Sequence, residues 1–138
     1  MIPYGRQDVN QDDIDAVVDV LKSDFLTQGP QVPKFEEALA TYCGVNFGVA
    51  VNSATSALHI ACLALDLKEG DILWTSPNSF VASANCGLYC GAEVDFIDID
   101  PQTYNMCVIE LENKLVKAKL KNKLPKIVIP VHFSGQSC

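Results

Sequence analysis

The chain has 138 residues, of which 49% are hydrophobic and 20% charged, and its formal net charge is −7 at pH 7. This length suits one domain with a sizeable core and is short for two. The negative charge argues against a nucleic-acid-binding protein, because that function needs a basic face. No apolar stretch approaches the roughly 18 residues of a membrane span, and residues 1–8 lack a signal-peptide pattern. We therefore expect a cytoplasmic protein without nucleic-acid or membrane partners.

The first 45 residues are predicted to form a helical segment. Asn10 is a good N-cap for a first helix, whose apolar face consists of Ile14, Val17, Val18 and Leu21. A turn follows at residues 25–30. A second helix is expected to begin at Pro33 and to end at Gly44, a common residue at helix C-termini.

Strands and helices alternate over residues 46–138. Apolar runs predict strands at residues 47–51, 71–75, 94–99 and 126–133. Helices are predicted over residues 55–65, with Leu58, Cys62 and Leu65 facing inward, then from Phe80 through Leu88, and from 108 to about 121. This rhythm is typical of an α/β fold with a mostly parallel sheet and helices on both faces. Pro130 suggests an edge or a bulge in the last strand.

The six cysteines lack the paired C-x-x-C spacing of a zinc site. Cys86 and Cys90 are four residues apart on one face of a predicted helix and could in principle share a metal ion. Buried reduced thiols that act as small hydrophobic side chains are the preferred interpretation, so we predict no metal site.

The junction between the predicted strand 47–51 and the following helix has the features of an anion site. Free backbone N–H groups, hydroxyls and the positive end of a helix dipole would meet at Ser53–Ser56. Serine and threonine are also ordinary capping residues there. Residues 76–80 place Phe80 after the next strand, although alone Phe80 is more often a core residue. Because ligands bind at the carboxyl ends of the strands in such sheets, both features together favour a flat, phosphorylated cofactor.

Four segments in order resemble the N-terminal part of the DegT/StrS-type sugar aminotransferases, which use pyridoxal 5′-phosphate. These segments are LTQGP with FEEA (26–30 and 35–38), VNSATSAL (51–58), PNSFVASAN (77–85) and PVHFSGQ (130–136). The likeness covers essentially the whole chain. It implies the N-terminal portion of the large domain of an aspartate-aminotransferase-type (fold type I) enzyme. NSATSAL together with LTQG looks most like the transaminases of the pseudaminic acid route.

The resemblance implies roles for particular residues. The backbone N–H groups of Thr55 and Ser56 would hold the cofactor phosphate, and Phe80 would stack on the pyridine ring. The sugar-nucleotide site would be lined by Tyr4, Asp24, Phe25, Leu26, Thr27 and Ala54. Apart from the resemblance, the two histidines, His59 and His132, are expected to be packed side chains and not catalytic groups.

The family also needs a lysine that forms the Schiff base and an aspartate that pairs with the pyridinium nitrogen. No lysine here matches the first position, and neither Asp98 nor Asp100 matches the second. We expect the lysine beyond residue 138. The chain is therefore interpreted as a truncated N-terminal part with no catalytic residue of its own, inactive alone.

The full-length protein is expected to be a homodimer that transfers an amino group from glutamate to a UDP-linked 4-keto-6-deoxy sugar. Three alternatives stay open at this point. The first is a sugar dehydratase of the same family, with histidine in place of the lysine. The second is a non-catalytic domain that binds a phosphate or a nucleotide, although no G-x-G-x-x-G follows the first strand. The third is a fragment that does not fold stably alone.

Overall fold

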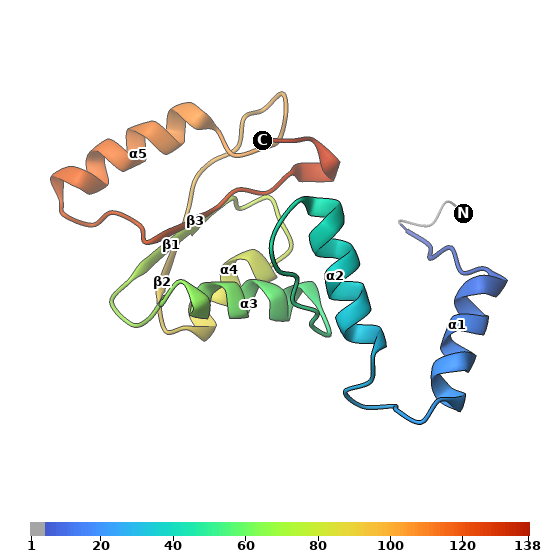
Figure 1. Ribbon diagram of the computed structural model, residues 1–138. Helices are drawn as coiled ribbons and strands as arrows, with labels where there is room; N and C mark the ends of the chain where they lie inside the picture. Colours follow the sequence, from blue (N-terminus) through green and yellow to red (C-terminus); the bar gives the residue numbers. More distant parts are fainter. Residues whose placement is uncertain (1–4) are drawn as a thin grey trace. The chain divides into compact units, whose positions relative to one another are not determined.

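The computed structural model describes residues 5–138, which form two compact units that divide between Ala50 and Val51. The first unit contains helices α1 (Gln11–Lys22) and α2 (Gln31–Cys43) (Figure 1). Helix α1 begins at the predicted N-cap: the Asn10 side chain accepts the backbone N–H groups of Asp12 and Asp13 at 2.8 and 3.2 Å. Because the Asp13 carboxylate in turn accepts the Asn10 amide, this helix start is a complete capping box.

Helix α2 starts two positions earlier than Pro33, and it ends as predicted at Gly44. The φ of Gly44 is 65°, in the left-handed region that glycine adopts without a Cβ penalty.

The strand predicted at residues 47–51 is wrong. These residues form no ladder with any other described segment, and the amide of Ala50 donates instead to the Glu36 carboxylate at 2.8 Å. Phe47 is 86% exposed. An apolar run becomes a strand only when a neighbouring strand pairs with its backbone, and hydropathy alone carries no information about that neighbour.

The second unit is built on a parallel sheet of three strands in the order β2-β1-β3. The strands are β1 (Ile72–Thr75), β2 (Glu93–Phe96) and β3 (Ile127–Ile129), and three helices accompany them, α3 (Ala54–Ala64), α4 (Ala82–Tyr89) and α5 (Val108–Leu120). Leu73 of the central strand pairs in register with Val94 on one side and Ile127 on the other. The α/β architecture with a parallel sheet is therefore confirmed.

Helices cover both faces of this sheet because successive side chains of β1 point to opposite sides. On one face Leu73 packs with Cys62 of α3 and Cys86 of α4. On the other face Trp74 packs with Ala118 of α5. Gly87 of α4 lies so close to the sheet that an added Cβ would come within 2.9 Å of Val94. Residues with small side chains thus let α4 approach the strands.

Several element boundaries differ from the predictions. Strand β2 ends at Phe96 and β3 at Ile129, so both strands are shorter than their apolar runs. Pro130 follows directly, which agrees with its inability to donate a ladder hydrogen bond. Helix α4 begins two residues after Phe80. Leu65, predicted to face inward, is 59% exposed because it lies at the C-cap of α3.

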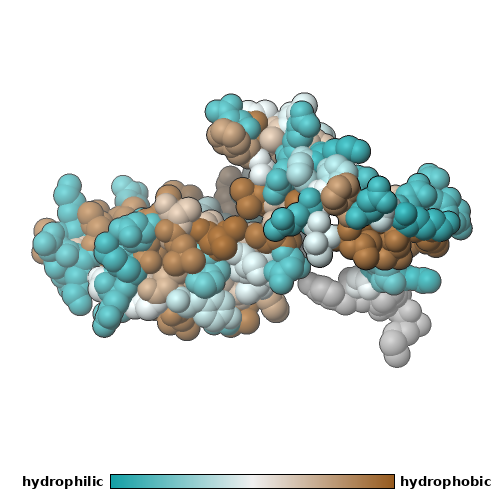
Figure 2. Space-filling view, turned by 60° about the horizontal axis from the view of Figure 1, so that its bottom comes forward, coloured by the Kyte–Doolittle hydropathy of each residue, from teal (hydrophilic) through white to brown (hydrophobic). Residues whose placement is uncertain are grey.

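Large apolar side chains remain on the surface, as the brown areas between teal ones show in Figure 2. In the second unit the exposed ones include Leu63, Leu65, Phe80, Leu88 and Leu120. Such surface is available for contact with further protein. Within residues 5–138, the helices are all too short or too polar to cross a lipid bilayer.

Candidate functional site

The carboxyl edge of the sheet gathers most of the second unit's predicted site residues. Helix α4 follows the carboxyl end of β1, and α3 runs antiparallel to β1 and leads into its amino end. Figure 1 accordingly shows both helices beginning at the end of the unit where β1 stops. The predicted anion site at Ser53–Ser56 and the aromatic residue Phe80 therefore belong to the same edge. This is the edge at which ligands bind in open α/β sheets.

Ser53 is the N-cap of α3, and its hydroxyl accepts the backbone N–H of Ser56 at 3.2 Å. The expectation that both the Thr55 and Ser56 amides are free is therefore wrong for Ser56. The reason is local: a serine at an N-cap satisfies the amide three residues on whenever no other acceptor is present. Among the hydrogen bonds of residues 5–138, none is donated by the backbone N–H of Ala54 or Thr55.

Hydroxyl and amide groups surround this helix start. The Ser56 hydroxyl donates to the Asn52 side-chain oxygen at 2.7 Å and lies 3.1 Å from the Ser53 hydroxyl. The Thr55 and Ser56 amides and the positive end of the helix dipole are groups that can hold an oxyanion. The chemistry of these donors fits a phosphate, provided that the weak Ser53–Ser56 bond opens.

Residues 76–80 follow the carboxyl end of β1. Phe80 is 75% exposed, so its interpretation as a core residue is wrong and its ring is free to contact a ligand. Ser76 is 3% exposed, and within the described residues its buried hydroxyl lacks a hydrogen-bond partner. A buried unpaired hydroxyl costs free energy, and such atoms occur where another group completes the site. The sequence pattern included Ser76 in the segment 76–80 but gave its hydroxyl no role of its own.

The remaining predicted site residues lie on a loop, at the start of a helix or outside the described residues. Asp24, Phe25, Leu26 and Thr27 form the exposed loop between α1 and α2 of the first unit. Ala54 is the exposed first residue of α3. Tyr4 lies outside the described residues. The assignment of these residues to a sugar-nucleotide site stays a prediction.

The two histidines differ. His59 is half-buried on α3, with its ring centroid 5.3 Å from that of Tyr89 on α4 in an edge-on arrangement, as expected of a packed side chain. His132 was also expected to be packed, and this is wrong: it lies beyond the end of β3 and is exposed. Its Nδ1 accepts the backbone N–H of Cys138 at 2.9 Å.

The loop between β2 and α5 is a further part of this edge; the sequence predicted a turn at residues 101–104 but gave it no role in the site. Its tight turn is held by the Asp100 carboxylate, which accepts the backbone N–H groups of Thr103 and Gln102 at 2.9 and 2.8 Å. These hydrogen bonds, from Thr103 first and then Gln102, hold the pKa of Asp100 below its usual range. From this turn the buried side chain of Asn105 reaches the segment after β3. The Asp-Pro dipeptide at 100–101 was the available signal, since it is typical of such turns.

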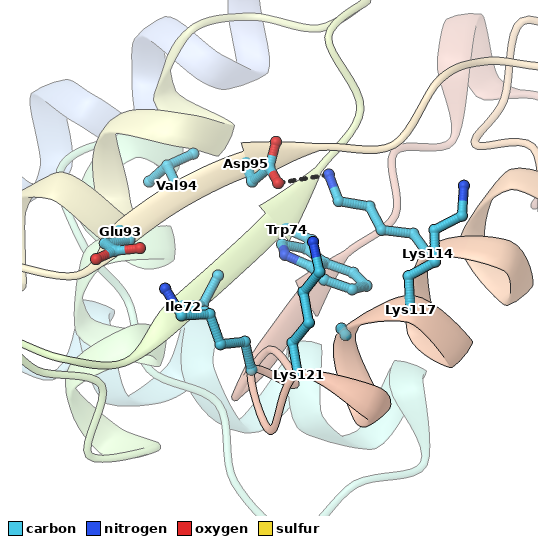
Figure 3. Close-up of a pocket in the computed structure, with 10 residues that line it drawn as sticks. Ile72, Trp74, Glu93, Val94, Asp95, Lys114, Lys117 and Lys121 are labelled. Carbon is cyan, nitrogen blue, oxygen red and sulfur yellow. Dashed lines mark ion pairs between the residues drawn. The ribbon is translucent and has the colours of Figure 1, made fainter.

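A groove of about 430 Å³ lies elsewhere in the unit, between β2 and α5 (Figure 3). Lys114 spans it, with its ammonium 2.6 Å from the Asp95 carboxylate and 5.0 Å from the ring centroid of Trp74. Burial works to raise the pKa of Asp95, but the Lys114 hydrogen bond and the Phe96 amide outweigh it, and the net shift is downward. The groove extends towards the amino ends of β1 and β2, away from the predicted ligand edge. We therefore do not assign the cofactor to it.

The cysteines are all free thiols. Burial, reinforced by a hydrogen bond with Cys86, raises the pKa of Cys62 to about 12. Across residues 5–138, no three histidine, cysteine or carboxylate side chains come together as metal ligands would.

Comparison with known proteins gives the family context. The model of the DegT/DnrJ/EryC1/StrS aminotransferase family matches residues 7–138. A UDP-4-amino-4,6-dideoxy-N-acetyl-beta-L-altrosamine transaminase of Campylobacter jejuni (strain 81-176) is 49% identical over 117 residues, which cover 85% of this chain and 31% of that protein. The chain spans about a third of the length of the curated relatives it matches.

Solved structures agree with the sequence comparison. Helicobacter pylori PseC, described as an aminotransferase involved in the biosynthesis of pseudoaminic acid, superimposes with a TM-score of 0.86 at 35% identity, over 99% of this chain and 35% of that one. The PLP-form of the protein Spr1654 from Streptococcus pneumoniae gives a TM-score of 0.87 at 29% identity, over 99% of this chain and 33% of that one. A PMP-form of the same protein matches equally well.

Proposed function

We propose, since this chain belongs to the DegT/DnrJ/EryC1/StrS aminotransferase family, that it forms the N-terminal part of the large domain of a pyridoxal-phosphate-dependent sugar aminotransferase. The full-length enzyme would transfer an amino group from an amino acid, which we infer to be glutamate, to the keto carbon of a UDP-linked 4-keto-6-deoxy sugar. The observation that carries this proposal is the 49% identity to an altrosamine transaminase over 85% of the chain. It favours the pseudaminic acid route or a related amino-sugar route.

The carboxyl edge supports a role in cofactor binding. The backbone N–H groups of Thr55 and Ser56 are the groups that would hold the phosphate, once the Ser53 hydroxyl releases the Ser56 amide, and the exposed ring of Phe80 is the group that would lie on the pyridine. When bound, pyridoxal phosphate supplies the carbonyl carbon that carries the amino group between donor and acceptor. The residues of this chain would bind and orient it, whereas the Schiff-base lysine would come from another part of the enzyme.

The test uses the full-length protein with pyridoxal phosphate, ¹⁵N-labelled glutamate and a UDP-linked 4-keto-6-deoxy sugar. We expect mass spectrometry to find one ¹⁵N atom in the sugar product, and no such product when glutamate is omitted. A deoxygenated sugar product that carries no ¹⁵N atom would point to the dehydratase alternative. Failure of the protein to bind pyridoxal phosphate would contradict the proposal altogether.

The proposal extends to assembly and to the isolated chain. We infer that the full-length enzyme is a homodimer, which is supported by the large apolar side chains left exposed here. Light scattering at micromolar concentration measures its molar mass directly.

We also infer that the 138-residue chain alone does not transaminate, since none of its lysines matches the Schiff-base position. Turnover by the isolated chain would contradict that inference.

A further inference from the structure

We propose that Asn105 is a positioning residue, which holds the segment Phe133–Ser137 in one conformation at the carboxyl edge of the sheet. Its side-chain oxygen accepts the backbone N–H of Phe133 at 2.9 Å. Its side-chain nitrogen donates to the carbonyls of Gln136 and Ser137, each at 3.1 Å. Asn105 is 5% exposed, so a single buried amide saturates three backbone groups of a segment about thirty residues further along the chain.

The held segment has a backbone that needs such support. It contains a 3-10 turn, η1 (Phe133–Gly135), in which Ser134 and Gly135 have φ values of 52° and 83°. A non-glycine residue in the left-handed region is unfavourable, and it persists when surrounding contacts over-determine it. The ring of Tyr104, next to Asn105, lies 5.9 Å from that of Phe133. Asn105 and its neighbour thus contact the segment through both polar and aromatic groups.

The loop that presents Asn105 is itself fixed. The Asp100 carboxylate caps its turn, and the backbone of Asn105 accepts the Asp100 amide at 2.9 Å. Ile99 and Met106 form an antiparallel bridge that closes the loop, and the Cys107 amide bonds to the Asp98 carbonyl at 2.9 Å. The Asn105 side chain therefore projects from a rigid base, which lets it set the position of the segment it binds.

The segment lies where it would affect the proposed site. It follows β3, whose last residue, Ile129, accepts the Thr75 hydroxyl at 3.0 Å. Thr75 is the last residue of β1, the strand that precedes Phe80. The segment and Phe80 thus follow the carboxyl ends of two hydrogen-bonded parallel strands, the position at which ligands bind. This inference rests on the proposed function, because it assigns Asn105 the role of shaping that same edge.

The experiment compares full-length wild type, Asn105→Ala and Asn105→Asp, with Asn113→Ala on the exposed face of α5 as the matched control. Amide hydrogen exchange over residues 131–138 reports whether the segment is held. Titration of the apoprotein with pyridoxal phosphate, and KM and kcat for the sugar, report whether the site depends on it. We expect Asn105→Ala to speed exchange and to raise the cofactor dissociation constant or the sugar KM about tenfold or more, since small displacements of a site are costly.

Asn105→Asp separates positioning from general stability. At pH 8 the aspartate carboxylate faces two carbonyl oxygens, so we expect it to weaken cofactor or sugar binding at least as much as the alanine substitution does. At lower pH the protonated carboxyl regains one donor, so the affinity relative to wild type should partly recover. The control Asn113→Ala should change none of these quantities.

An unchanged rate of amide hydrogen exchange over residues 131–138 in Asn105→Ala would overturn the inference. Faster exchange with unchanged cofactor affinity, KM and kcat would overturn the positioning role and leave Asn105 as a residue for stability only. If the wild type neither binds pyridoxal phosphate nor turns over the sugar, the proposed function fails and the positioning role fails with it. Exchange would then still show whether Asn105 holds the segment, so the two failures are distinguishable.

Discussion

The hydroxyl of Ser53 accepts the backbone N–H of Ser56 at 3.2 Å, and this bond closes the first turn of α3. The predicted phosphate site needs the same amide. If the proposed function holds, the N-cap and the cofactor compete for one donor. Binding must then replace a long serine–amide bond with a shorter, charge-assisted one, which is favourable because hydrogen bonds to an ionised acceptor are the stronger kind.

Replacing Ser53 by glycine tests this competition. Glycine is nearly as good an N-cap as serine, so the free energy of unfolding should fall by only about 0.3 kcal/mol. Because the competing acceptor is gone, the dissociation constant of pyridoxal phosphate for the full-length protein should fall. The control Ser56→Ala keeps the cap bond and loses the hydroxyl that contacts Asn52. Weaker binding by Ser53→Gly would mean that the Ser53 hydroxyl is itself a phosphate ligand.

Phe80→Ala should weaken cofactor binding with little effect on stability. The ring is 75% exposed, so its removal leaves no cavity, and the free energy of unfolding should change by less than about 0.5 kcal/mol. Loss of an aromatic stacking contact should cost about 0.5–1.5 kcal/mol of binding free energy. Fluorescence titration with pyridoxal phosphate measures it, with Leu120→Ala, also exposed, as the control. An affinity equal to that of the wild type would remove Phe80 from the site.

The buried thiols should resist alkylation in the folded protein. The pKa of Cys62 is raised to about 12, so at pH 8 this residue is a neutral thiol, and only the thiolate is the reactive nucleophile. Cys43 and Cys138 are exposed, and they should react with iodoacetamide in a reaction time that leaves Cys62 unmodified. Peptide mass spectrometry measures the fraction of each cysteine that is alkylated. Denatured protein is the control, because every cysteine should react there. Equal labelling of Cys62 and Cys43 in folded protein would contradict the burial of α3 against α4.

The turn held by Asp100 should make stability depend on pH in the acid range. Its folded-state pKa is lowered by the Thr103 and Gln102 amides, so the carboxylate stabilises the fold above its unfolded pKa of about 3.9. That contribution is lost as the pH falls through the lower, folded-state pKa. Chemical denaturation should therefore show that the free energy of unfolding differs less between pH 7 and pH 3 for Asp100→Ala than for wild type. An identical difference in both proteins would show that the carboxylate does not support the turn.

Local signals in the sequence determined much of the fold. The Asn10 cap, the left-handed Gly44 and the alternation of apolar runs with helical periods predict α1, the end of α2, and the β-α order of the second unit. The cap and the glycine succeed because each depends on a few neighbouring residues: a cap on the next turn, and a glycine on its own φ. The three apolar runs that became strands did so because each found a partner strand in the sheet. The motif order also placed the chain in its family, which the comparisons confirm.

Tertiary structure decided what depends on partners remote in sequence. The apolar run at 47–51 is not a strand, because its Ala50 amide bonds to Glu36 and no ladder forms. The Ser56 amide is capped, Phe80 is exposed, and Asn105 meets the segment after β3 across about thirty residues. Periodicity reports which side of an element is apolar, but a hydrogen bond or a surface position is set by whatever the fold brings beside it. For that reason the sequence by itself predicted the ligand edge, and only the packed structure showed which donors there are free and which are already bound.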